Sequence, residues 1–307
     1  AVPPEFLSIA WVILAQALSG IAKDLNKMSA KSSIKTLVPK DQQSSLFRWV
    51  AILTGSKNAL KGLGFFLGAL LLAVFGFRLS VGIMAGALLL VALVSLRLLT
   101  QEMGRAKNKP KFSQVFSKNS ALNYLSFARM CLFASRDVWF VVALPVYLSS
   151  RFDWQHEFVG AFMAVWVIGY GIVQSLAPRV IGKAKGSLPD GAMLSVWGNL
   201  LALSTLLLAA VLHYLPFPQA SIVIGLLVFG GIFAINSSLH SYVIVAIARE
   251  DGVSMDVGFY YMANALGRLL GTILSGWIFQ LYGIVVCLLI SAILAVLAAF
   301  YIRKVDV

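Results

Sequence analysis

Five cationic side chains lie within long apolar stretches of this sequence, together with a single acidic side chain. The cations are Lys57, Lys61, Arg129, Arg136 and Arg268, and the acid is Asp137. A cation at the centre of a membrane helix costs about 2.5–3.5 kcal/mol on insertion scales, so one carboxylate cannot compensate five cations. We therefore expect an anionic ligand, preferably a polyanion. Arginine suits phosphate, arsenate and carboxylate oxygens because its planar guanidinium group binds them in bidentate fashion, whereas lysine acts as a point charge.

Helical spacing places several polar side chains on shared faces. Arg129 and Arg136 are seven residues apart, which puts them within about 20° of one another around a helix. Tyr261, Asn264 and Arg268 are spaced i, i+3 and i+7 and also share a face. The pairs with i, i+4 spacing are Lys57 with Lys61, Asn236 with His240, and Tyr170 with Gln174. We predict that these side chains line a wet interior and bind substrate.

Each candidate also has a structural alternative. Lys57 and Lys61 could extend to the membrane surface along a long helix. Arg136 and Asp137 are adjacent and point about 100° apart, so each could hold a neighbouring helix, and Asp137 is a candidate for ion pairing or coupling. His240 could be a packing residue, a ligand or a proton carrier, but one histidine makes no metal site.

The composition indicates that these residues are carried by helices in a lipid bilayer. Of 307 residues, 60% are hydrophobic and only 12% are charged, with a mean hydropathy of +0.87. A soluble domain has about a quarter of its residues charged. A bilayer crossing needs roughly 20 apolar residues. We therefore predict an all-α polytopic membrane protein with nine transmembrane helices, at roughly 6–25, 46–76, 79–99, 120–148, 157–177, 191–212, 220–246, 255–281 and 283–302.

The distribution of positive charge predicts the topology. Segments 23–48 and 97–118 are rich in Lys and Arg, so we place both in the cytoplasm, with the C-terminus on the same side. The lysine series in the first segment is expected to be a solvated extension. We predict a multi-pass protein of the inner (plasma) membrane. Its net charge of +13 is explained by cytoplasmic loops that meet anionic lipid, so no nucleic-acid partner is required.

A basic segment at 100–119 divides the predicted spans. Residues 1–99 hold three spans and residues 120–307 hold six, which suggests two bundles joined by a cytoplasmic linker. The sequence begins Ala1-Val2-Pro3-Pro4 without an initiator Met, and its first span would enter from outside. We expect a fragment of a twelve-span protein that lacks its first three spans, with an open apolar side and no transport activity of its own.

This organisation resembles the major facilitator superfamily, in which substrate binds near the membrane midplane between two halves. The basic loop 178–186 is similar to that superfamily's loop between its eighth and ninth spans. More specific strings resemble the ArsJ family of organoarsenical efflux permeases: Gln16 to Lys31, Leu53 to Gly62, Ala134 to Val142, Trp166 to Gly171, Phe233 to Ser237 and Gly258 to Asn264.

The resemblance implies a substrate and a metabolic partner. Members of that family export 1-arseno-3-phosphoglycerate, an unstable ester that forms when a glyceraldehyde phosphate dehydrogenase uses arsenate in place of phosphate. The implied activity is efflux that confers arsenate resistance, with an arsenylated phosphoglycerate as the anionic substrate and no cofactor.

Two other function classes are an enzyme embedded in the membrane and a transporter of a different organic anion. A membrane-embedded enzyme would need clustered carboxylates, a His/Cys/Ser constellation or a metal set, and the sequence offers none, so we expect no enzyme. Cys131 and Cys287 both lie within spans and imply neither a disulfide nor a metal site. A transporter of another organic anion, such as a sugar phosphate or a dicarboxylate, fits the charge argument equally well, and only the resemblance separates the two.

Overall fold

The chain folds into helices throughout the part that is described. The computed structural model describes residues 9–39, 41–98, 119–185, 189–249 and 252–305, and within these ranges it has helices and no strand. The helices are α1 (Ile9–Leu37), α2 (Gln43–Leu98), α3 (Ser120–Phe140), α4 (Ala143–Phe152), α5 (His156–Lys185), α6 (Gly191–Tyr214), α7 (Pro218–Ile247) and α8 (Val253–Ile302). The predicted all-α class is confirmed.

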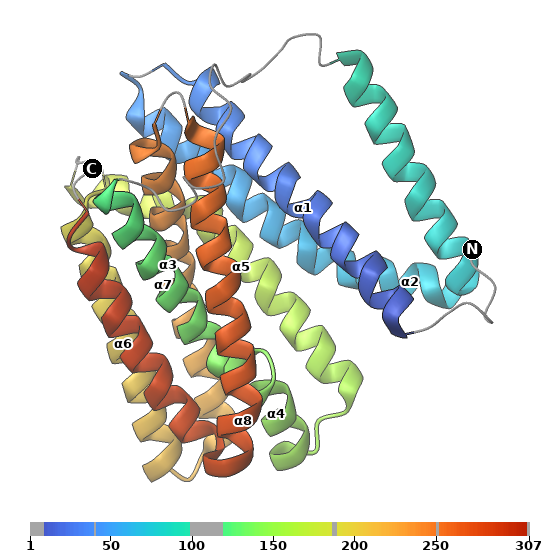
Figure 1. The fold of residues 1–307 in the computed structure, drawn as a ribbon. Coiled ribbons are helices and arrows are strands. Elements are labelled where there is room, and N and C mark those ends of the chain that lie inside the picture. Colours follow the sequence, from blue (N-terminus) through green and yellow to red (C-terminus); the bar gives the residue numbers. More distant parts are fainter. Residues whose placement is uncertain (1–8, 40, 99–118, 186–188, 250–251, 306–307) are drawn as a thin grey trace.

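Two of the helices are too long for a single membrane crossing and fold back on themselves. α2 has 56 residues and α8 has 50, whereas a bilayer core needs roughly 20. Each contains one glycine with a positive φ and a ψ near 180°, Gly76 in α2 and Gly283 in α8. That backbone region is essentially restricted to glycine. Figure 1 shows both helices reversing direction, α8 at the lower end of the bundle.

The predicted count of nine transmembrane helices is not supported. Among the described residues the structure has eight helices, and six segments are long and apolar enough to cross a membrane. The segments are Gln43–Leu98, Ser120–Phe152, His156–Ile181, Gly191–Tyr214, Pro218–Ile247 and Val253–Ile302. Helical structure continues on both sides of Gly76 and Gly283, so each expected pair of spans is one element. α1 is outside this set because lysines occupy its second half.

Two basic segments that were expected to be loops are largely helical. α1 continues to Leu37 and α2 begins at Gln43, so the connection expected over 23–48 is much shorter than predicted. The reason is local, because no Gly or Pro interrupts the sequence between Gly20 and Pro39. α5 likewise passes through Pro178 to Lys185. The predicted linker 100–119 lies outside the described residues except for Asn119, which caps α3 by accepting a hydrogen bond from the Ala121 amide.

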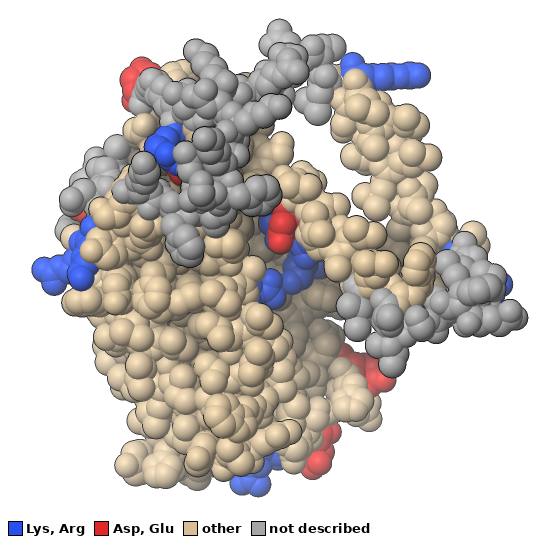
Figure 2. All heavy atoms as spheres, in the orientation of Figure 1, with Lys and Arg blue, Asp and Glu red and all other residues tan. Residues whose placement is uncertain are grey.

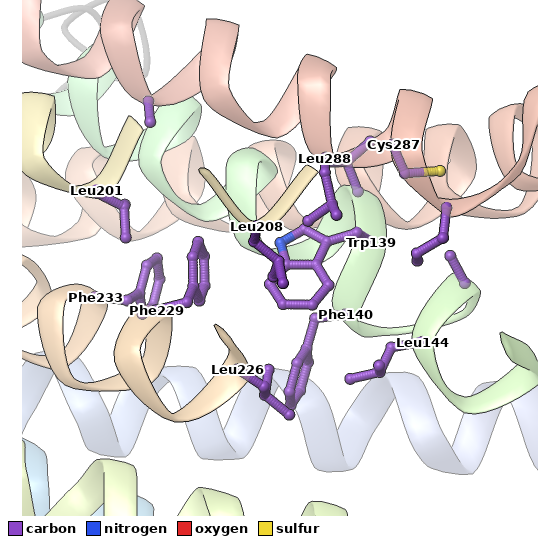
Figure 3. Close-up of a cluster of buried hydrophobic side chains, with 14 of the residues drawn as sticks. Trp139, Phe140, Leu144, Leu201, Leu208, Leu226, Phe229, Phe233, Cys287 and Leu288 are labelled. Carbon is purple, nitrogen blue, oxygen red and sulfur yellow. The ribbon is translucent and has the colours of Figure 1, made fainter. Parts of the chain in front are cut away.

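Aromatic side chains fix α3 against α7. The Trp139 indole meets Phe229 edge to face with ring centroids 5.0 Å apart, and Phe229 stacks on Phe233 at 5.7 Å. Leu208 of α6 and Leu288 of the second half of α8 lie beside the same indole (Figure 3). Trp139 comes shortly after the charged residues of α3 in the sequence. The packing of its indole therefore holds their backbone in a fixed position.

Small residues bring α8 into close contact with α3. A Cβ atom added at Gly267 would lie 2.1 Å from the carbonyl oxygen of Met130, and one added at Gly271 would lie 2.9 Å from Cβ of Asp137. Arg268 lies between these two glycines in sequence. The close approach therefore lets the Arg268 side chain reach α3.

Gly267→Ala is expected to destabilise the protein because the new methyl group would overlap the backbone of α3. Overpacking of this kind costs about 1–3 kcal/mol. Thermal unfolding of the purified protein in detergent measures the effect. The matched control is Gly276→Ala on the same helix, where the nearest atom to an added Cβ is 3.9 Å away, so its stability should be unchanged or slightly higher. Equal melting temperatures for the two variants would contradict the proposed contact.

Candidate functional site

A fully buried carboxylate joins two of the predicted arginines. Arg136 donates from Nε to Oδ1 of Asp137 at 2.6 Å, and Arg268 donates from Nε to Oδ2 at 3.1 Å. The Asp137 side chain has no exposed surface, whereas 46% of the Arg268 side chain is exposed. The sequence placed Arg136 and Asp137 about 100° apart, but the long Arg136 side chain bends back to its neighbour. Asp137 does hold a neighbouring helix, because Arg268 belongs to α8.

The Arg136 guanidinium group is surrounded by aromatic rings. Its central carbon lies 4.8 Å from the ring centroid of Phe133 and 5.2 Å from that of Phe233. Cations are attracted to the faces of aromatic rings, more strongly where water is excluded. The rings and Asp137 together stabilise one buried cation, and the carboxylate is shared with Arg268. The pair of arginines therefore keeps an excess of one positive charge.

Arg129 lies two helical turns before Arg136 and uses uncharged partners. It donates from Nε to Oδ1 of Asn264 at 3.1 Å and from Nη1 to the Ser237 carbonyl at 3.2 Å. Its guanidinium carbon lies 4.1 Å from the Phe133 ring centroid, so this ring contacts both arginines of α3. Asn264 and Arg268, which the spacing put on one face of α8, both bond to α3.

Gln174 connects three helices beside these arginines. Its Oε1 accepts a hydrogen bond of 2.6 Å from Nδ2 of Asn58 on α2, and its Nε2 donates to Oγ of Ser237 on α7 at 3.1 Å. Tyr170, one turn earlier on α5, stacks on Trp166 at 5.6 Å between ring centroids. Asn58 was missed by the sequence analysis, although its position between Lys57 and Lys61 was a usable signal.

Asn236 and His240 have different surroundings despite their i, i+4 spacing. Asn236 donates its amide hydrogens to the carbonyls of Trp197 on α6 and Ile232 on its own helix, at 2.9 and 3.1 Å. It thereby ties α7 to α6. His240 is 1% exposed and lies close enough to Arg129 to interact electrostatically. Its Nδ1 has no hydrogen-bond partner among the described residues.

Lysines from α2 face the arginines of α3 and α8. Lys61 is within electrostatic range of Arg136, Arg268 and Asp137, and Lys57 is within range of lysines on α1. Both lysine side chains remain exposed. Figure 2 shows Lys and Arg atoms gathered in a hollow between the main body of the protein and its α1–α2 side. The sequence-predicted cations therefore belong to one group. The lysines of this group come from α2, and its arginines come from α3 and α8.

Lys31 of α1 is a member of this group that the sequence analysis missed. It was expected to be solvated, yet only 2% of it is exposed and its Nζ lies 5.2 Å from the ring centroid of Tyr261. Lys27 lies 5.9 Å from the same ring and also forms an ion pair with Asp24. Lys27 and Lys31 share a helix face at i, i+4 spacing, which was the available signal.

The charges of the group do not balance within the described part of the chain. Its acids are Asp24 and Asp137, and its cations are Lys23, Lys27, Lys31, Lys57, Lys61, Arg129, Arg136 and Arg268. No cluster of three or more His, Cys, Asp or Glu side chains that could hold a metal ion occurs among the described residues. The arrangement is suited to binding a polyanion by charge-assisted hydrogen bonds.

Asp137→Asn is expected to lower stability strongly because it leaves Arg136 buried without a counter-charge. Breaking a buried ion pair on one side costs about 3–5 kcal/mol. The double variant with Arg136→Gln should recover part of this loss. Melting temperatures in detergent provide the measurement. The control is Asp256→Asn, whose partner Arg249 has a side chain that is 49% exposed and can be solvated by water. A loss no larger than that of the control would contradict the ion-pair account.

Comparison with known sequences gives one match. The sequence model of the Major Facilitator Superfamily matches residues 4–196, well over half of the 307-residue chain. No curated protein matches the chain. The matched range includes α1 to α5 and the start of α6, and therefore Lys31, Lys57, Lys61 and the charged residues of α3.

Proposed function

Because this chain belongs to the Major Facilitator Superfamily, whose members are multi-pass secondary transporters and not enzymes, we propose that it exports an organic anion by alternating access. The observation that carries the proposal is the excess of cations shared by α1, α2, α3 and α8. Desolvated cations without counter-charges are unstable. An anion that enters between α1 and α2 on one side and α3 and α8 on the other would neutralise these cations. Anion binding therefore explains why the cations are present at this position.

The proposed substrate is 1-arseno-3-phosphoglycerate. The charge excess supports an organic anion in general, and the resemblance of the sequence to organoarsenical efflux permeases favours this ester. A glyceraldehyde phosphate dehydrogenase that uses arsenate would supply it inside the cell. Its export across the inner membrane would remove arsenic and confer resistance to arsenate. A sugar phosphate or a dicarboxylate is the alternative substrate, and the same group of cations would bind it.

The roles of the site residues follow from their contacts. We assign Arg136 and Arg268 to one anionic end of the substrate, with Lys57 and Lys61 contributing from α2. Asp137 competes for the same two arginines, so an entering oxyanion would take over hydrogen bonds that this carboxylate accepts. Asn264 and Gln174 orient Arg129 and Ser237 through their hydrogen bonds. The same interior is lined or supported by the remaining candidates, which are Tyr170, Tyr261, Asn236 and His240.

The proposed topology has nine crossings. We propose that α2 and α8 each cross twice, reversing at Gly76 and Gly283, and that α1 crosses once. α3 and α4 together make one crossing, and α5, α6 and α7 make one each. Residues 1–99 and 120–307 would then form the two bundles, with 100–119 as the linker. Basic residues near Leu37 and near the C-terminus support a cytoplasmic location for those ends.

Arg268 variants test the site in the full-length protein. Everted membrane vesicles are supplied with glyceraldehyde 3-phosphate, NAD, arsenate and the dehydrogenase, so that the ester forms outside them, and accumulated arsenic is measured. Arg268→Gln should abolish uptake because the anion would then be poorly compensated. Arg268→Lys keeps the charge but loses the planar fork, so uptake should be impaired. Arg151→Gln, at the C-terminal end of α4 and outside the charged group, is the control and should be neutral.

Two results would overturn parts of this proposal. Normal uptake by a well-inserted Arg268→Gln protein would remove this residue from the site. Uptake of a sugar phosphate or a dicarboxylate by the wild type, with none of the arseno ester, would keep the transporter and replace the substrate.

A further inference from the structure

Lys31 is a buried cation whose Nζ atom has no hydrogen-bond partner among the described residues. Among the described residues, the other charged side chains that are buried to a similar degree are Arg129, Asp137 and Asp256. Each of these three forms hydrogen bonds, Asp137 and Asp256 with arginines and Arg129 with α7 and α8. The Lys31 Nζ atom has no such bond within the described part of the chain.

The neighbours of Lys31 increase the positive charge around it. The cations within electrostatic range are Arg129, Lys57 and Lys27, and within the described part of the chain no acid is among the groups that act on Lys31. The nearest acid in the sequence, Asp24, is exposed and paired with Lys27. Two buried cations, Lys31 and Arg129, therefore lie near one another, and none of the described carboxylates acts on Lys31.

One tyrosine ring contacts both of these cations. The Tyr260 ring centroid lies 5.9 Å from Nζ of Lys31 and 5.1 Å from the guanidinium carbon of Arg129. Nδ1 of His240, which lies near Arg129, is also buried without a hydrogen-bond partner among the described residues. A buried polar group left unsatisfied costs about 1–3 kcal/mol. The Lys31 ammonium group is a buried donor without an acceptor, which indicates that a ligand with acceptor atoms belongs beside it.

We propose that Lys31 and Arg129 form a second anion subsite, which binds one end of a small molecule that carries an anionic group at each end. Arg136, Arg268 and Lys61 bind the other end. The proposal rests on the function proposed above, export of an organic anion, and it adds that Lys31 and Arg129 bind a second anionic end of the substrate.

The spacing of the two subsites along α3 sets the size of that molecule. Arg129 and Arg136 are seven residues apart, which is about 10 Å along the helix axis. The two guanidinium carbons lie 4.1 and 4.8 Å from the Phe133 ring centroid, so the groups are closer together than the spacing of their backbones along the axis. An extended three-carbon chain with a phosphate-like group at each end can bridge this distance. A small monoanion can occupy only one subsite at a time.

A matched pair of stable probes tests the second subsite. Propane-1,3-diyl bisphosphate carries an anionic group at both ends, and propyl phosphate carries one. Isothermal titration calorimetry with the purified full-length protein in detergent measures both affinities. The wild type should bind the bisphosphate about tenfold or more tightly than the monophosphate, which is the scale of one extra charged hydrogen bond. Lys31→Gln should bring this ratio close to one.

Lys35→Gln is the control on the same helix. Lys35 donates to the backbone carbonyls of Ala246 and Ala248, so its role is to hold α1 against the end of α7, and the affinity ratio should be kept. Lys31→Met adds a second readout. Removing an uncompensated buried charge should raise the melting temperature without ligand, while the additional stabilisation by the bisphosphate should shrink.

The outcomes separate the subsite from the proposed function. If the wild type binds both probes equally and Lys31→Gln changes neither affinity, the second subsite is wrong and anion export stands. If the wild type binds neither probe, both proposals fail.

A lipid headgroup offers the same phosphate chemistry. If Lys31→Met abolishes stabilisation by phosphatidylglycerol vesicles but leaves the bisphosphate affinity unchanged, Lys31 binds lipid and the substrate subsite is overturned.

Discussion

Buried positive charge without enough acid is the constraint on which the rest of this structure depends. A buried cation loses its hydration, and only a counter-charge or several hydrogen bonds can replace it. The protein supplies one carboxylate, Asp137, to two arginines, and amide and carbonyl oxygens to Arg129. Among the described residues, the partners that it supplies to Lys31 are the rings of Tyr260 and Tyr261. The group of cations is left short of negative charge, and we propose that an anionic substrate supplies it.

The scaffold positions these charges through contacts that need small or aromatic residues. Gly267 and Gly271 allow α8 to approach the backbone of α3, so Arg268 can share Asp137 with Arg136. Gly55 of α2 and Gly171 of α5 make a second close contact, since a Cβ at Gly55 would lie 2.4 Å from the Gly171 carbonyl oxygen. The first contact is within the α3–α8 body, and the second joins that body to α2. A motion that opens the site would have to either keep these two contacts or break them.

The sequence predicted the helical class and much of the charged group because both follow from local patterns. Long apolar segments require helices in lipid, and i, i+4 or i+7 spacing places side chains on one face. It could not predict the burial of Lys31, since this depends on α1 lying against Tyr260 and Tyr261, more than two hundred residues later. It also could not assign Asn236, whose amide bonds to α6, because spacing along one helix does not show which neighbour a face meets. The pairing of Arg136 with Asp137 depended on the flexibility of the arginine side chain, which helical geometry does not describe.

The central claim is that this group of cations binds an oxyanion, and diffraction at the arsenic absorption edge from crystals of the full-length protein grown with arsenate tests it directly. The account predicts an anomalous peak within hydrogen-bonding distance of Arg136, Arg268 or Lys61, or beside Lys31 and Arg129, that weakens when phosphate is added in excess. A map at saturating arsenate with no peak at either place, or with peaks only beside surface residues such as Arg179 or Lys304, would contradict it.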